Sequence, residues 1–139
     1  MSDFKSFLSG KRVALVGPAS TLLGEGRGAF IDGHDVVVRL NHAWPLPEDL
    51  KKDVGSRIDV IYHNLNPNCQ RIRRRDIKSM HRDGVQWIVS THPWRERRFR
   101  GRLLRFCRLN RGLLRFRAIP GSLKRRMCRQ VRHPNCGLM

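Results

Sequence analysis

The chain has 139 residues, 40% of them hydrophobic, which is enough for one domain of ordinary size around a single core. Its formal net charge is +18. No stretch approaches the roughly 20 consecutive apolar residues of a membrane-spanning helix, and the N-terminus lacks the apolar segment of a secretion signal. These features argue against a membrane-spanning or secreted protein, and we expect a single cytoplasmic domain over residues 1–139.

The sequence pattern predicts strands and helices in alternation. Short runs rich in β-branched residues predict strands over residues 11–17, 34–41, 58–64 and 85–91. A loop rich in glycine and proline follows the first strand, and residues 44–57 form a connection with room for a short helix. Apolar residues at helical spacing predict helices within residues 69–84, 94–110 and 122–131, with a strand or turn over 112–121.

This alternation is typical of an α/β fold with a mostly parallel sheet covered on both faces. In such sheets, ligands bind beyond the carboxyl ends of the strands. The loops that follow Val16, Leu40 and Tyr62 are therefore the places to look for a site.

Glycines gather after the first predicted strand, at Gly17, Gly24, Gly26 and Gly28. Backbone N–H groups in such a turn can approach a phosphate closely. The spacing fits neither a dinucleotide fingerprint nor a P-loop. Taken alone, plain loop geometry explains these glycines better than phosphate binding.

Arg39 and Asn41 end the second predicted strand, and alternation places both on the face opposite Leu40. An amide such as that of Asn41 suits the edge of a nucleobase or a ribose hydroxyl. The alternative is structural: Asn41 caps the following turn, and Arg39 pairs with Asp32, Asp35 or Asp53.

The histidines and cysteines are scattered. His42 and His63 lie just past predicted strand ends and are candidate site residues, while Asp53 is placed to pair locally with Arg57. The four cysteines include no C-x-x-C pair, which favours reduced thiols over a disulfide framework or a metal site. We therefore expect no metal ligands.

The positive charge lies mainly in the last third of the chain. Residues 95–139 contain 15 Lys or Arg against the single acid Glu96, whereas residues 1–94 contain 14 Lys or Arg against 10 Asp or Glu. Arginine helices over 95–132, interleaved with aromatic residues, are what a nucleic-acid or anionic-surface binding module would use. The alternative is a solvated helix face.

The order of the motifs resembles a known family. The segment "VALVGPASTLLGEGRGAFIDGHDVVVRLNHAWP", followed by "DVGSRIDVIYHN", resembles the large sialylmotif of the sialyltransferases, glycosyltransferase family 29. The resemblance covers about residues 11–64. The terminal "HPNCGLM", residues 133–139, resembles the opening of the small sialylmotif.

The resemblance implies an inverting transfer of sialic acid from CMP-sialic acid to a glycan hydroxyl, on a Rossmann-like three-layer α/β/α fold of the GT-A-variant type, without a metal. Its partners would be a nucleotide-sugar donor and a glycan acceptor. The positions that match donor-nucleotide contacts, together with the neighbouring Thr21, are Gly17, Thr21, Asn41, Asn135, Cys136 and Gly137.

Three departures from the family pattern bear on activity. Pro18 replaces a second nucleotide-binding Asn, and Cys136 replaces a Thr. The family's catalytic His lies downstream of the small sialylmotif, beyond Met139. We therefore expect an N-terminal portion of a glycosyltransferase, incomplete at its C-terminus, that carries the donor-nucleotide half of the site and leaves the catalytic base unassigned.

Overall fold

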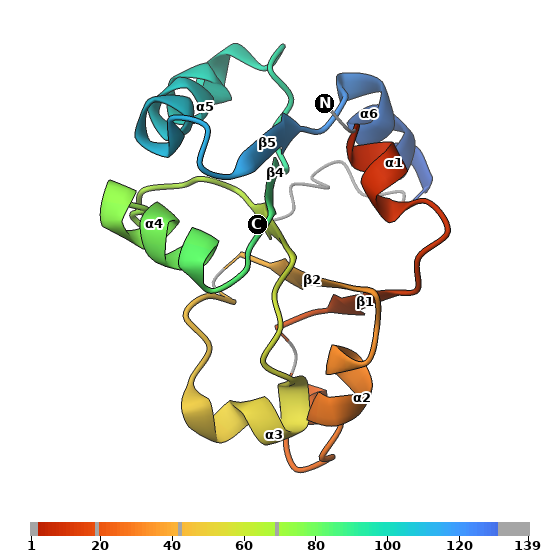
Figure 1. Cartoon of the computed structure of the whole chain (residues 1–139). Helices are drawn as coiled ribbons and strands as arrows, with labels where there is room; N and C mark the ends of the chain where they lie inside the picture. Colours follow the sequence, from red (N-terminus) through yellow and green to blue (C-terminus); the bar gives the residue numbers. More distant parts are fainter. Residues whose placement is uncertain (1–2, 19, 42, 69, 131–139) are drawn as a thin grey trace.

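A computed structural model gives the structure of the chain and describes residues 3–18, 20–41, 43–68 and 70–130. Five strands form one parallel sheet in the order β1-β2-β3-β4-β5 (Figure 1). The strands are β1 (Val13–Val16), β2 (Val36–Leu40), β3 (Val60–His63), β4 (Trp87–Ser90) and β5 (Arg115–Ala118). The helices are α1 (Phe4–Leu8), η1 (Ser20–Leu22), α2 (Gly28–Asp32), η2 (Glu48–Leu50), α3 (Lys51–Val54), α4 (Arg74–Arg82), α5 (Arg97–Asn110) and α6 (Gly121–Gln130).

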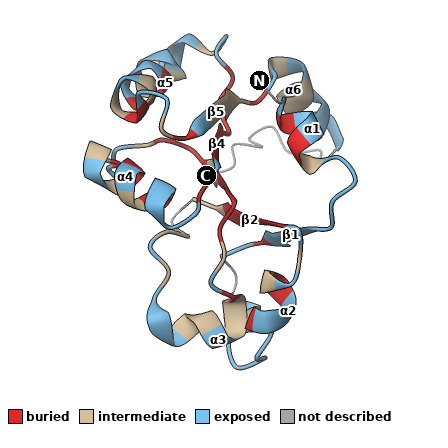
Figure 2. Ribbon diagram, in the orientation of Figure 1, coloured by how far each residue is buried: buried red, intermediate tan, exposed pale blue. Residues whose placement is uncertain are grey.

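One face of the sheet packs against the helices that connect consecutive strands. The strand register aligns one row of residues across this face: Val16, Arg39, Ile61, Ile88 and Phe116. Ile61 and Ile88 pack with Ile77 of α4 and Leu103 of α5, all of them fully buried. The main core therefore lies between the sheet and the helices α4 and α5, where Figure 2 shows the inward sides buried.

The opposite face of the sheet packs against α1. Phe4 and Phe7 contact the Trp87 ring, with ring centroids 5.0 and 6.0 Å away, and Val38 and Val60 complete the cluster. The helix α6 lies beside α1 on this side of the sheet (Figure 1). Helices thus cover both faces, and the α/β fold with a parallel sheet is confirmed.

Local signals explain the ends of the longer helices. At the start of α4, the Asp76 carboxylate accepts the N–H of Arg73 at 2.7 Å, and Gly84 follows the end of the helix with φ +92°. The helix α5 ends at Arg111 in a left-handed conformation, with φ 46°. These caps place the two helices within the ranges that the sequence predicts.

Two helices, α1 and α2, are absent from the sequence prediction. Each has five residues, which is too short for an apolar period to stand out. Tertiary contacts hold them in place: Phe4 and Phe7 anchor α1, and Ile31 anchors α2 against Val16 and Val37. Among the described residues, no helix is both long and apolar enough to cross a membrane.

Candidate functional site

The carboxyl edge of β1 and β2 carries three of the expected site residues. Gly17 follows β1, Thr21 lies in η1 just beyond it, and Asn41 follows β2. Gly17 and Thr21 are exposed, and a Cβ atom added to Gly17 would meet nothing within 4 Å. The backbone above β1 is therefore open to a ligand. The other three expected residues, Asn135, Cys136 and Gly137, lie outside the described residues.

Asn41 links the ends of β2 and β3. Its backbone is left-handed, with φ 49°, so the extended conformation of β2 ends before it. The Asn41 N–H donates to the carbonyl of Tyr62 at 2.6 Å, and its Oδ1 accepts the N–H of Asn64 at 3.2 Å. The amide thus caps the turn after β3.

Asparagines shape the loop that leaves β3. The Oδ1 of Asn64 accepts the N–H of Asn66 at 2.9 Å, and the Oδ1 of Asn66 accepts the N–H of Asn68 at 3.2 Å. Asn64 is buried at the carboxyl edge, beside Asn41. Sequence reasoning missed Asn64, although its place directly after a predicted strand could have identified it.

Asp53 holds the glycine loop after β1. Its carboxylate accepts the N–H of Gly24 at 2.9 Å and the N–H of Gly26 at 2.8 Å, and both glycines have positive φ. These hydrogen bonds keep the pKa of Asp53 below its ordinary value. The predicted pairing of Asp53 with Arg57 is wrong, since the carboxylate is used by the loop. An internal carboxylate thus occupies the place that a phosphate would take on these two N–H groups.

Asp32 of α2 forms hydrogen bonds with the turn at residues 55–57. Its carboxylate accepts the N–H groups of Ser56, at 2.8 Å, and Arg57, at 3.0 Å, and also the Ser56 hydroxyl. Partial burial would raise the pKa of Asp32, but these hydrogen bonds hold it below the ordinary value. Arg57 donates in return to the carbonyls of Asp32 and His34 and to Asp59. This network ties α2, the turn and β3 together.

Arg39 is fully buried in the sheet row that faces α3. Its guanidinium donates to the backbone carbonyls of Val54, Gly55 and Arg57, at 2.6, 3.1 and 3.0 Å. These carbonyls take the place of the acid with which Arg39 was expected to pair. Burial lowers the pKa of Arg39, and the charge of the nearby Asp32 opposes that shift. Arg39 therefore supports the turn at 55–57 and does not face a ligand.

His63 is used within the fold. Its Nδ1 accepts the N–H of Leu65 at 2.8 Å, and its Nε2 lies 2.8 Å from the Gln70 side-chain oxygen, which fits a neutral ring. The ring is fully buried at the end of β3. These contacts make His63 a structural residue, and the second candidate, His42, lies outside the described residues.

A second histidine lies at the carboxyl edge, after β4. His92 is buried and stacks on Phe99 with centroids 3.5 Å apart, and burial lowers its pKa to about 4. Its Nδ1 and the buried Thr91 hydroxyl have no hydrogen-bond partner within the described ranges. Sequence reasoning considered the ends of the first three strands only, and the same rule applied to the fourth could have found His92.

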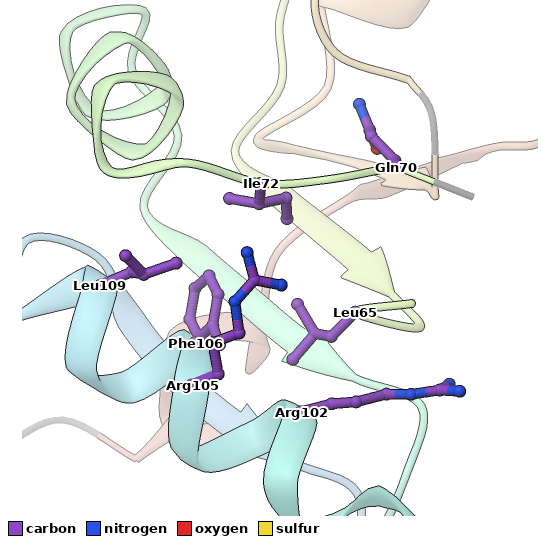
Figure 3. Close-up of a pocket in the computed structure, with 7 residues that line it drawn as sticks. All are labelled: Leu65, Gln70, Ile72, Arg102, Arg105, Phe106 and Leu109. Atoms are coloured by element: carbon purple, nitrogen blue, oxygen red, sulfur yellow. The ribbon is translucent and has the colours of Figure 1, made fainter. Parts of the chain in front are cut away.

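A small pocket lies between the loop after β3 and α5 (Figure 3). Leu65, Ile72, Phe106 and Leu109 form its apolar walls, and Gln70, Arg102 and Arg105 add polar groups. Figure 3 shows Arg102 extending away from the pocket, while the Arg105 guanidinium lies beside Phe106. The space in this pocket is about 20 Å³, which holds a single small group and not a nucleotide.

The described part of the chain offers no group of three or more His, Cys, Asp or Glu side chains that could hold a metal ion. Cys107 is a free thiol, as expected, and Cys69 and Cys136 lie outside the described residues. The polar side chains of the carboxyl edge are mainly amides and hydroxyls. Such groups suit hydrogen bonding to a neutral or anionic ligand.

Comparison with known proteins agrees with the motif order. The family model of glycosyltransferase family 29 (sialyltransferase) matches residues 5–97, which include β1 to β4 and the turn at 55–57. Sialyltransferase-like protein 2 of Oryza sativa subsp. indica is 43% identical over 53 residues, and the β-1,6-galactosyltransferase GALT29A of Arabidopsis thaliana is 42% identical over 53 residues. Each alignment covers 38% of this chain and 13% of the relative's length. Because the family model matches well over half of the chain, the protein belongs to glycosyltransferase family 29, the sialyltransferase family.

Proposed function

We propose that the chain binds the nucleotide of CMP-sialic acid at the carboxyl edge of β1 and β2. One observation carries the proposal: the fold brings Gly17, Thr21 and Asn41 to that edge within the family-matched segment. Asn41 supplies the amide that reads the cytidine, and the open backbone at Gly17 lets the nucleotide approach. Asn135, Cys136 and Gly137 complete the donor site.

The reaction that this site serves is a displacement at the anomeric carbon of the donor. The bond to the phosphate oxygen breaks, CMP leaves with its electron pair, and a glycan hydroxyl forms the new bond with inversion. The acceptor proton passes to a base, and the proposed reaction uses no metal cofactor. The 139 residues by themselves bind the nucleotide weakly and transfer nothing.

The position of Asn41 explains how its amide can bind the nucleotide although Pro18 replaces the second nucleotide-binding Asn. Its Oδ1 is committed to the Asn64 N–H, so the amide plane is fixed against the end of β3. A fixed amide loses little side-chain entropy when it binds a nucleobase. Asp53 holds the neighbouring glycine loop in a defined shape on the other side of the site.

Calorimetric titration of the chain with CMP, UMP and AMP tests the proposal. We expect CMP alone to bind. Asn41→Gly should weaken CMP binding about tenfold or more, because Gly tolerates the φ of 49° and removes only the amide. Asn41→Ala should act in the same direction. Asn68→Ala, an exposed asparagine in the loop that leaves β3, is the matched control and should leave the affinity unchanged.

A second variant separates binding from folding. Gly17→Leu places a side chain where the structure has open space, so the melting temperature should stay within a few degrees of the parent while CMP binding is lost. Binding of UMP or AMP as tight as that of CMP, or an unchanged CMP affinity in Asn41→Gly, contradicts the cytidine assignment. The two similar relatives carry different activity names, so this choice of base is the decisive measurement.

A further inference from the structure

The outward face of α5 carries a dense strip of positive charge. The helix has six arginines and no acidic residue. At 100° per residue, five of them fall within an arc of about 140°. We call these five residues the arginine stripe: Arg97, Arg98, Arg102, Arg105 and Arg108.

Few acids offset this charge. Among the described residues, one member of the stripe forms an ion pair, Arg98 with Glu96 at 3.6 Å. Glu96 is also bound by Lys124 at 2.5 Å, so its charge is shared. Arg97, Arg105 and Arg108 are exposed. Like charges this close together repel one another, and an anionic surface laid against the stripe would relieve the repulsion.

The aromatic residues of α5 itself, Phe99 and Phe106, are not placed to stack on bases. Phe99 is covered by His92 on one side, with Arg98 and Arg102 4.6 and 5.1 Å from its ring centroid. Phe106 is buried and packs on Phe116 at 5.0 Å. A protein that binds single-stranded nucleic acid offers open aromatic faces. The rings of α5 therefore offer no stacking surface for bases, which favours a partner that is recognised mainly by its charge.

An exposed apolar residue borders the stripe. Leu104 is 46% exposed and, by the helical geometry, lies about 20° around the axis from Arg97. Arginines beside an exposed Leu on the outward side of a helix match a helix that lies on a membrane with its cations at the lipid phosphates. Between Arg97 and Arg108 the stripe extends roughly 17 Å along the axis, which suits a flat array of charges.

We propose that the arginine stripe docks the protein on the surface of an anionic phospholipid bilayer. The axis of α5 lies parallel to the membrane, the guanidiniums bind headgroup phosphates and carboxylates, and Leu104 enters the headgroup layer. The contact is peripheral and reversible. It leaves the carboxyl edge of β1 and β2, which belongs to a different part of the sheet, open to a nucleotide (Figure 1).

Co-sedimentation of the full chain with vesicles tests the docking. The vesicles are phosphatidylcholine alone or phosphatidylcholine with roughly one third phosphatidylserine, at physiological salt. We expect binding to the anionic vesicles only. The triple variant Arg97→Gln, Arg105→Gln, Arg108→Gln should weaken it about a hundredfold, since each cation near a charged membrane contributes a few-fold or more. All three side chains are exposed, so circular dichroism should show an unchanged fold.

The matched control removes the same charge from the other side of the sheet. Arg125→Gln, Arg126→Gln, Arg129→Gln changes three exposed arginines of α6 and should weaken vesicle binding by no more than about threefold. Equal losses in the two triple variants would mean that net charge, not the stripe, binds the vesicles, and would overturn the proposal. So would tighter binding to a short DNA duplex than to the anionic vesicles, or no change with Leu104→Ser.

Discussion

Gly55 shows how closely the turn at 55–57 packs. A Cβ atom at this position would lie 2.5 Å from the Asp32 Oδ1, and the φ of +77° disfavours any L side chain. We predict that Gly55→Ala lowers the free energy of unfolding by about 2–3 kcal/mol. Urea denaturation measures the change.

Gly101 provides the opposite case for the same substitution. It lies inside α5, exposed, with open space around its missing side chain. Gly101→Ala should raise the stability by about 1 kcal/mol, because Ala is the better helix former. If the two variants changed stability equally, the close approach of Asp32 to Gly55 would not be what constrains the turn.

Individual residues show where sequence reasoning succeeds. The position of Asn41 at the end of a predicted strand correctly placed it at the carboxyl edge. Its bond to Asn64 and the use of Asp53 by the glycine loop depend on segments that approach one another only in the folded chain. No local pattern encodes such partners, so the pairing of Asp53 with the nearby Arg57 was the natural but wrong choice.

At the scale of elements, the glycine loop and Asp53, at the end of α3, form one structural unit. The loop has no side chains of its own to hold the N–H groups of Gly24 and Gly26, and Asp53 supplies the acceptor from the end of α3. Asp53→Asn keeps one oxygen of the carboxylate and removes its charge. We predict faster amide hydrogen exchange at Gly24 and Gly26, with the rest of the sheet protected as before.

The control for the loop is a nearby acid outside the network. Asp49→Asn changes an exposed carboxylate in η2 and should leave the exchange at both glycines unaltered. CMP binding should weaken in Asp53→Asn, because the loop beside Gly17 loses its defined shape. Unchanged exchange in Asp53→Asn would show that the loop is held by its own backbone conformation.

The sequence predicts the longer and more clearly patterned elements and misses the shortest helices. The strands and the helices α4, α5 and α6 carry clear periods or β-branched runs, and the structure confirms them. The five-residue helices α1 and α2 depend on contacts with Trp87 and with Val37, which lie on strands that the local sequence does not contain. The distinctive motif residues Asp32, Arg39 and Gly55 proved to be structural for the same reason: their partners come from other elements.

At the scale of the whole molecule, buried His92 makes stability depend on pH. Burial, reinforced by the nearby Lys124, lowers the pKa of His92 to about 4 in the folded protein, against an ordinary value of 6.5. The unfolded chain therefore takes up a proton as the pH falls below about 6.5, while the folded protein does not until about pH 4. The stabilisation is fully present above pH 6.5 and is lost as the pH falls to about 4.

We predict that the free energy of unfolding falls by on the order of 2 kcal/mol over this pH range. His92→Phe should abolish this fall, since Phe keeps the stack on Phe99 without a titrating group. Denaturation at a series of pH values measures it. The difference between the two proteins isolates His92 from the carboxylates that titrate at lower pH. Parallel curves for the two proteins would show that the ring is protonated as easily in the fold as outside it.

The order of the strands governs the order in which the molecule can assemble during synthesis. Each strand pairs with the one made just before it, so the sheet can grow at one edge as the chain leaves the ribosome. The helix α1 is the exception, because Phe4 and Phe7 pack on Trp87, and Asp3 pairs with Arg117, which follows it by 114 residues. The first helix to be made is thus among the last to dock, and it closes a sheet that the rest of the chain has already built.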